Sequence, residues 1–202
     1  MNFGLYMIIT KPVLAYTEIA EICVKQEIKY LQLREKDIED RVLLQIAKDI
    51  SSVTKGSETL FIINDRLDIC LMSDADGIHL GQDDVCIDDI RRVLPVGKVI
   101  GLSTHNHEQA VNALKYEPDY IGFGPVYTTP TKRKPDPVVG CEMLKEIISI
   151  SNKPVVAIGG IDESNLHEVL KVGAKNICMV RYFMENKDLE NRIIKMKEYI
   201  NQ

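Results

Sequence analysis

A chain of 202 residues in which 45% of the residues are apolar can bury one sizeable core, so we expect a single domain over residues 1–202. Its formal charge of −5 argues against a nucleic-acid partner held by bulk charge, and an anionic ligand would need a local cluster of basic residues. No apolar run approaches the roughly 18 residues that cross a membrane, and the apolar N-terminus lacks the basic region and cleavage site of a secretory signal.

The five cysteines are spread along the chain and include no Cys-x-x-Cys pair: Cys23, Cys70, Cys86, Cys141 and Cys178. An odd number of cysteines among mostly apolar neighbours is typical of small core residues in a reducing compartment. We therefore expect a cytoplasmic protein without a zinc site.

Apolar runs of strand length alternate with runs of helical spacing along the whole chain. Strands are expected at residues 5–10, 30–33, 60–63, 77–80, 99–104, 154–158 and 176–180, with a sixth strand beginning at 120–122. Helices are expected at residues 17–26, 66–73, 88–94, 108–115, 141–149, 164–172 and 187–200, and another begins at Arg41 with Asp40 as its N-cap. Residues 124–140 hold four prolines and no periodicity, which indicates a long loop.

Eight strand-helix pairs in a chain of this length predict a (β/α)8 TIM barrel, an α/β fold. Nearly continuous apolar strands favour a parallel sheet that is covered on both faces. The alternative is a flavodoxin-like or Rossmann sheet, which usually has fewer strands, and no Gly-x-Gly-x-x-Gly fingerprint follows the first strand. No repeat, low-complexity run or linker divides the chain.

Two acidic residues, Asp65 and Asp84, follow the third and fourth strands. Parallel neighbouring strands end on the same rim, so we expect the two carboxylates to lie near each other. Such a pair suits a hard cation such as Mg²⁺. The alternative is that Asp65 caps the next helix and that Asp84 is a solvated loop acid.

Basic residues gather at the same predicted rim, although the protein is acidic overall. Arg34 and Lys36 follow the second strand, and Lys132 lies in the long loop after the sixth. Positive side chains beside a carboxylate-bound metal suit a diphosphate, because they neutralise the oxygens that the metal leaves free. The alternative is a set of surface salt bridges.

Two further features favour a phosphate ligand. Gly159 and Gly160 follow the seventh strand, where this fold commonly cradles phosphate, although a tight strand-to-helix turn explains them equally. The loop at 124–140 holds three threonines and three basic residues and is either an active-site cover or a surface insertion. The histidines offer no obvious general base; the ring of His79 is expected to face the barrel mouth. Departure of a diphosphate needs charge stabilisation rather than a base.

Taken in order, these strand ends resemble the thiamine-phosphate synthase family. The motifs that carry the resemblance are Gln-Leu-Arg-Glu-Lys at 32–36, Ile-Asn-Asp at 63–65, His-Leu-Gly-Gln-Asp-Asp at 79–84, Gly-Leu-Ser-Thr-His at 101–105, Gly-Phe-Gly-Pro-Val-Tyr at 122–127, Thr129, Thr131, Lys132, and Ile-Gly-Gly-Ile at 158–161. The resemblance covers most of the chain. It implies a transferase that joins hydroxymethylpyrimidine diphosphate to hydroxyethylthiazole phosphate through a pyrimidine carbocation.

The resemblance also assigns residues to the first substrate. The groups implied to bind its diphosphate are Arg34, Lys36, Asn64 and Lys132. Asp65 and Asp84 are implied to hold Mg²⁺, and Gln32 and Ser103 are implied to contact the pyrimidine. The implied catalytic groups are Arg34, Lys36, Ser103 and Lys132.

For the thiazole phosphate, the resemblance implies Thr129 and Thr131, with backbone amides near Gly160 and Val180. The chain departs from the family after the eighth strand, where small residues with a serine are usual and this chain has Val180 and Arg181. Arg181 either adds a contact to the phosphate or narrows the cradle.

Two other functions compete with this interpretation. A sister enzyme, the thiazole tautomerase, has a catalytic histidine where this chain has Pro125, and it lacks the full pair of acids. A non-catalytic sensor of phosphate ligands is the third candidate, and only Arg181 supports it. In each case the expected partners are small molecules, without nucleic acid or membrane, and a homo-oligomer is compatible with all three.

Overall fold

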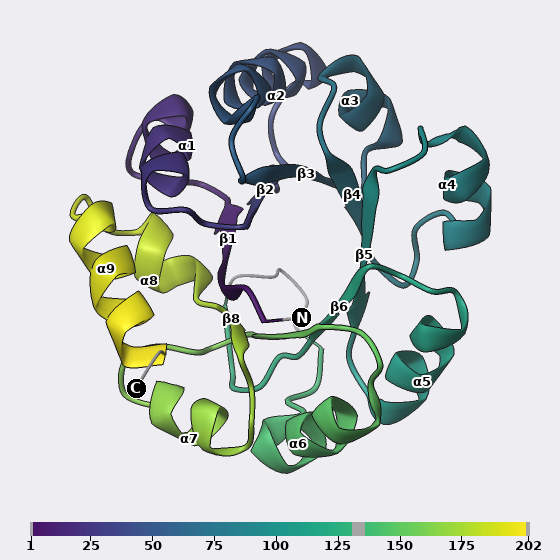
Figure 1. Cartoon of the computed structure of the whole chain (residues 1–202), viewed down its shortest axis with the longest axis vertical. Coiled ribbons are helices and arrows are strands. Elements are labelled where there is room, and N and C mark those ends of the chain that lie inside the picture. The colour runs from purple at the N-terminus through teal and green to yellow at the C-terminus, as the bar shows by residue number, and fades with distance from the viewer. Residues whose placement is uncertain (1, 131–135, 201–202) are drawn as a thin grey trace.

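The computed structural model describes residues 2–130 and 136–200. Eight parallel strands pair in sequence order and close into a barrel, and the helices form a ring around it (Figure 1). The strands are β1 Gly4–Ile9, β2 Tyr30–Leu33, β3 Leu60–Asn64, β4 Gly77–Leu80, β5 Val99–Thr104, β6 Tyr120–Phe123, β7 Val155–Ile158 and β8 Asn176–Cys178. The expected (β/α)8 barrel is confirmed, and the open-sheet alternative is wrong.

The helices cover the outer face of the barrel with the apolar positions that their periodicity indicates. In the second helix, for example, Leu43, Ala47 and Ile50 are buried. The described helices are α1 Tyr16–Lys25, α2 Asp40–Thr54, α3 Leu67–Met72, α4 Ile87–Val93, α5 His107–Lys115, α6 Gly140–Ile150, α7 Leu166–Lys171, α8 Val180–Met184 and α9 Leu189–Ile200. No helix in this part of the chain is long and apolar enough to span a membrane.

Several expected boundaries differ by one or two residues, and two of these differences have a clear cause or consequence. Asp40 is the first residue of α2 rather than its N-cap, and its carboxylate accepts a hydrogen bond of 2.7 Å from Arg66 Nη1. A charged guanidinium is a stronger partner for a carboxylate than a helix N–H, which explains the difference. The eighth strand ends at Cys178, and Val180 begins the short extra helix α8.

The barrel has an inner core because alternate residues of each strand point to opposite faces. The buried members of this inner core are Tyr6, Ile8, Tyr30, Ile62, Tyr120, Val156 and Cys178. Along the register, Asn64 of β3 lies opposite His79 of β4, and Ser103 of β5 lies opposite Gly122 of β6. Polar side chains therefore enter the barrel interior just below its C-terminal mouth.

Candidate active site

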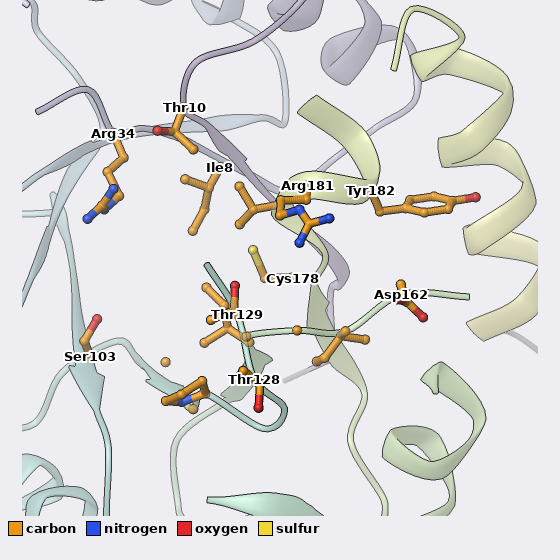
Figure 2. Close-up of a pocket in the computed structure, with 18 of the residues that line it drawn as sticks. Ile8, Thr10, Arg34, Ser103, Thr128, Thr129, Asp162, Cys178, Arg181 and Tyr182 are labelled. Carbon is orange, nitrogen blue, oxygen red and sulfur yellow. The ribbon is translucent and has the colours of Figure 1, made fainter. Parts of the chain in front are cut away.

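Two adjoining hollows open at the C-terminal ends of the strands. One has a volume of about 440 Å³ and a wall built from β1, β5, β6, β7 and β8, and the other measures about 680 Å³. Both are lined by Thr10, Arg34, Val180, Arg181 and Glu185. Figure 2 shows Arg34 and Ser103 reaching toward one opening from different strands. This is the end of the barrel at which (β/α)8 enzymes place their chemistry.

Asp65 is fixed at the end of β3 by its backbone and by a basic neighbour. Its carboxylate is ion-paired with the ammonium of Lys36, which follows β2. Its φ of 47° is left-handed, a conformation that aspartate tolerates better than most residues, and its N–H donates to the His79 carbonyl oxygen at 2.8 Å. The alternative role as a helix cap is wrong, because Arg66 directly precedes α3 and no side chain caps that helix.

Asp84 follows β4, the strand that pairs with β3, so the two acids follow adjacent strand ends. Its side chain is exposed, and Oδ2 accepts a hydrogen bond of 2.6 Å from the N–H of Gly81. This bond closes the turn after the strand. Within residues 2–130 and 136–200, no group of three or more His, Cys, Asp or Glu side chains is placed to hold a metal ion.

Ser103 is the candidate residue whose surroundings are most closely defined. Its hydroxyl lies 2.8 Å from His79 Nε2, and the residue lines the smaller hollow. The ring of His79 lies inside the barrel rather than in the mouth: only 8% of the residue is exposed, and Nδ1 is 3.0 Å from the Tyr120 hydroxyl. Gln32 is also buried below the mouth, where its Nε2 donates to the Tyr6 hydroxyl at 2.8 Å.

The turn after β7 is built from two glycines that no other residue can replace easily. Gly159 and Gly160 have φ values of 98° and 65°. A Cβ on Gly159 would lie 2.4 Å from Pro125 Cβ, and a Cβ on Gly160 would lie 2.6 Å from the Thr128 carbonyl oxygen. The glycines therefore bring the β6 and β7 loops together at the wall of the smaller hollow. The tight-turn explanation is correct, and it also leaves backbone exposed to the hollow.

Arg181 lies on α8, beside this turn. Its Nε is 3.3 Å from Glu185 Oε1 one turn later, and both residues line the two hollows. The next residue, Tyr182, points away from the centre of the opening (Figure 2), and the Arg192 guanidinium lies 4.3 Å from the centre of its ring. A short extra helix after β8 is a usual part of phosphate sites in this fold.

Several polar residues of the cavity wall were not assigned from the sequence: Thr10, Asp136, Asp162 and Asn186. Thr10 directly follows β1, so the rule that ligands meet strand ends would have found it. His105 also lines the cavity; its Nδ1–H donates to the Gly124 carbonyl oxygen at 2.7 Å, and Nε2 is 3.6 Å from Asp136. No pattern in the sequence links these loop residues to one another.

A family model described as thiamine monophosphate synthase matches residues 5–183. This chain belongs to that family. The thiamine-phosphate synthase of Persephonella marina is 39% identical over 202 residues, which cover 98% of this chain and 95% of that protein. The one from Synechocystis is 42% identical over 182 residues, which cover 90% of this chain but about half, 52%, of that protein. Among solved structures, a thiamine phosphate pyrophosphorylase from Pyrococcus furiosus is similar, with a TM-score of 0.87 and 31% identity over 98% of this chain and 96% of that one.

The barrel mouth gathers most of the residues that the family resemblance implies. Those that line the smaller hollow are Arg34, Ser103, Thr129, Gly160, Val180 and Arg181. Lys36 lines the larger one, whereas Asn64, Asp65 and Asp84 lie at the ends of β3 and β4 outside both walls. Gln32 lies beneath the mouth, in contact with Tyr6. Thr131 and Lys132 lie outside the described residues.

Proposed function

We propose that this protein is a thiamine-phosphate synthase, a transferase that condenses hydroxymethylpyrimidine diphosphate with hydroxyethylthiazole phosphate and releases diphosphate. Membership of the family supports this, since relatives of that name match nearly the whole chain. The observation in the site that carries it is the position of Arg34, which lines both hollows. Two adjoining spaces that share two cations, Arg34 and Arg181, suit two phosphorylated substrates that react with each other. A homo-oligomer and a cytoplasmic location stay predictions.

The proposed reaction breaks the bond between the pyrimidine methylene carbon and a diphosphate oxygen. The electron pair leaves with the diphosphate, and the carbocation that results takes the lone pair of the thiazole nitrogen. Negative charge grows on the leaving group, so cations beside it lower the barrier. Arg34 and Lys36 supply the positive charge, and the side-chain amide of Asn64 at the end of β3 can donate a hydrogen bond to the diphosphate. The resemblance gives Lys132 the same role.

The acids at the ends of β3 and β4 fit a magnesium ion. Carboxylate oxygens are the ligands that Mg²⁺ prefers, and the ion usually keeps several waters and takes oxygens from a phosphate substrate. Two carboxylates, Asp65 and Asp84, are therefore a sufficient protein contribution. When bound, the ion would supply positive charge to the leaving diphosphate. Lys36, which is paired with Asp65 in the free protein, is then available to the phosphate oxygens.

The second phosphate has a separate place in this proposal. Thr129, Gly160 and Arg181 line the smaller hollow on the side of the β6, β7 and β8 loops. A hydroxyl, glycine backbone and a guanidinium are all donors to phosphate oxygens. They hold the thiazole phosphate, with Val180 at the start of α8. The resemblance gives Thr131 the same role.

The wall between these polar groups is apolar. Ile8, Ile158 and Val180 line the smaller hollow and come from β1, β7 and the start of α8. An apolar wall keeps water from the carbocation, which water would otherwise capture in place of the thiazole. Ser103, on β5, contributes a hydroxyl that contacts the pyrimidine ring.

The test is to incubate the protein with both substrates and Mg²⁺ and to identify the products. Thiamine phosphate and diphosphate in equal amounts would support the proposal. Exchange of protons on the thiazole phosphate alone would indicate the tautomerase, and saturable binding without any turnover would indicate a sensor. Either of these two results overturns the proposal.

A further inference from the structure

A continuous chain of hydrogen bonds crosses the inside of the barrel below the mouth. Gln32 Nε2 donates to the Tyr6 hydroxyl at 2.8 Å, the Tyr6 and Tyr120 hydroxyls are 2.5 Å apart, and the Tyr120 hydroxyl is 3.0 Å from His79 Nδ1. His79 Nε2 is 2.8 Å from the Ser103 hydroxyl. Of these residues only Ser103 lines the cavity. The chain therefore connects five strands to a single side chain at the substrate surface.

Two glycines of the barrel strands leave space for this chain of hydrogen bonds. A Cβ on Gly101 would lie 2.4 Å from the Tyr120 hydroxyl oxygen and 2.6 Å from His79 Nδ1, so glycine is needed where those two groups meet. Gly122 also lies next to the ring, and a Cβ there would be 3.6 Å from His79 Cε1. The two glycines therefore leave the space on β5 and β6 that the imidazole occupies.

Both phenols in the chain keep their protons. Burial raises the pKa of Tyr6 and of Tyr120 well above the ordinary value for tyrosine. Each hydroxyl therefore has one proton to donate and lone pairs to accept with. When each group in such a chain accepts one hydrogen bond and donates one, all the protons are donated in the same direction along it. An end group that can only donate sets this direction.

In this chain the end group that can only donate is the side-chain N–H of Gln32, which donates to Tyr6. If each hydroxyl accepts one bond and donates one, Tyr6, which accepts from Gln32, donates to Tyr120, and Tyr120 donates to His79 Nδ1. A neutral imidazole that accepts at Nδ1 carries its proton on Nε2, which then donates to the Ser103 oxygen.

We propose that this chain holds Ser103 as a hydrogen-bond donor toward the cavity, with Tyr6, Tyr120 and His79 as positioning residues. The Ser103 oxygen accepts from His79, so the serine proton is directed to the substrate. The matching ligand group is a neutral acceptor such as a ring nitrogen of an aminopyrimidine. The identity of the ligand rests on the proposed function, whereas the direction of the chain does not.

The direction is measured on the free, full-length protein with ¹⁵N-labelled histidine. Two-bond ¹H–¹⁵N correlations report which ring nitrogen carries the proton, and the His79 signals are those lost in His79→Gln. Should that variant not fold, Ser103→Ala identifies them by the shift that it causes at the contacted nitrogen. We expect a neutral His79 with its proton on Nε2. A proton on Nδ1, or on both nitrogens at pH 7.5, overturns the proposal.

The effect on substrate is measured with Tyr120→Phe. Loss of this hydroxyl removes the partner of His79 Nδ1, so we expect a mixture of His79 tautomers and a rise of about tenfold in KM for the pyrimidine diphosphate, the size of one hydrogen bond. KM for the thiazole phosphate should not change. Equal rises in both KM values, or an unchanged tautomer, would overturn the role of the chain.

Tyr30→Phe is the matched control. The Tyr30 ring packs 5.2 Å from the Tyr120 ring and 5.7 Å from the Tyr6 ring, centre to centre, but its hydroxyl is not a link in the chain. We expect the same tautomer and the same KM values as in the unaltered protein; a tenfold change in this control would assign the effect to ring packing and overturn the proposal. Because the tautomer is read without turnover, an inactive protein with the proton on Nε2 would refute the proposed function alone.

Discussion

The ammonium of Lys36 and the carboxylate of Asp65 are ion-paired across the ends of β2 and β3. The lysine side chain is 47% exposed and the aspartate 16%, so the acid is the more enclosed partner. A magnesium diphosphate would separate the pair, with the carboxylate turned to the cation and the ammonium to the phosphate. Both charged groups thus already lie at the same mouth in the free protein, and each would exchange its partner when the substrate binds.

Asp65→Asn tests the carboxylate without altering the turn, since asparagine also tolerates a φ of 47°. We expect kcat to fall about 10²–10³-fold, the usual loss for one charge-stabilising group, and half-maximal activity to need more Mg²⁺. Steady-state rates over a Mg²⁺ titration measure both. Asp68→Asn is the control, because Asp68 lies in α3 and is paired with Arg66, which precedes that helix. Unchanged kcat in Asp65→Asn would remove Asp65 from the site.

Arg34→Gln tests the arginine that follows β2 and lines both hollows. We expect kcat to fall about 10²-fold or more, because glutamine keeps donors but removes the charge that faces the leaving group. Arg41→Gln, on the exposed face of α2, should leave kcat unchanged. Initial rates of diphosphate release compare the two. Similar rates in both variants would contradict the assignment of Arg34.

Arg181→Ser tests the departure from the family pattern after β8. Arg181 lies beside the glycine turn on the side assigned to the thiazole phosphate, so we expect KM for that substrate to change about tenfold, as for one charged hydrogen bond, and KM for the pyrimidine diphosphate to stay within twofold. An increase in affinity for the thiazole phosphate would mean that the side chain narrows the cradle. The same change for both substrates would argue against a local role.

Gly160→Ala tests the close approach of the β6 and β7 loops. The added Cβ would lie 2.6 Å from a backbone oxygen at a φ of 65°, so we expect the free energy of unfolding to fall by about 2–3 kcal/mol. Gly97→Ala is the matched control: its φ of 91° is also positive, but nothing lies within 4 Å of the new Cβ. We expect it to lose about 1 kcal/mol. Urea denaturation gives both values, and equal losses would refute the importance of the contact.

The fold follows from the sequence because each strand of the closed barrel is covered on both faces and therefore appears as an apolar run. For the same reason, the end of β8 cannot be recognised in the sequence. Met179 and Val180 are as apolar as the strand before them, yet Val180 starts a helix, and no turn residue marks the change. Asp40 shows a second limit, since its partner Arg66 is 26 residues away and is brought near only by packing of α2 on α3.

The residues that lie at the barrel mouth were also accessible from the sequence, because strand ends are visible as abrupt polar residues. The interior was not. The orientation of His79 depends on Tyr120, 41 residues further along the chain, and on glycines that leave space between them. Such contacts form only when the barrel closes, and no local pattern in the chain encodes them.

In the proposed reaction, a divalent cation and basic side chains at one mouth of the barrel stabilise the departing diphosphate. The most direct measurement is the rate of diphosphate release with both substrates present, over a Mg²⁺ titration and after addition of a chelator. We expect a rate that saturates with Mg²⁺ and falls at least about 100-fold in the chelator. A rate that the chelator leaves unchanged would contradict it.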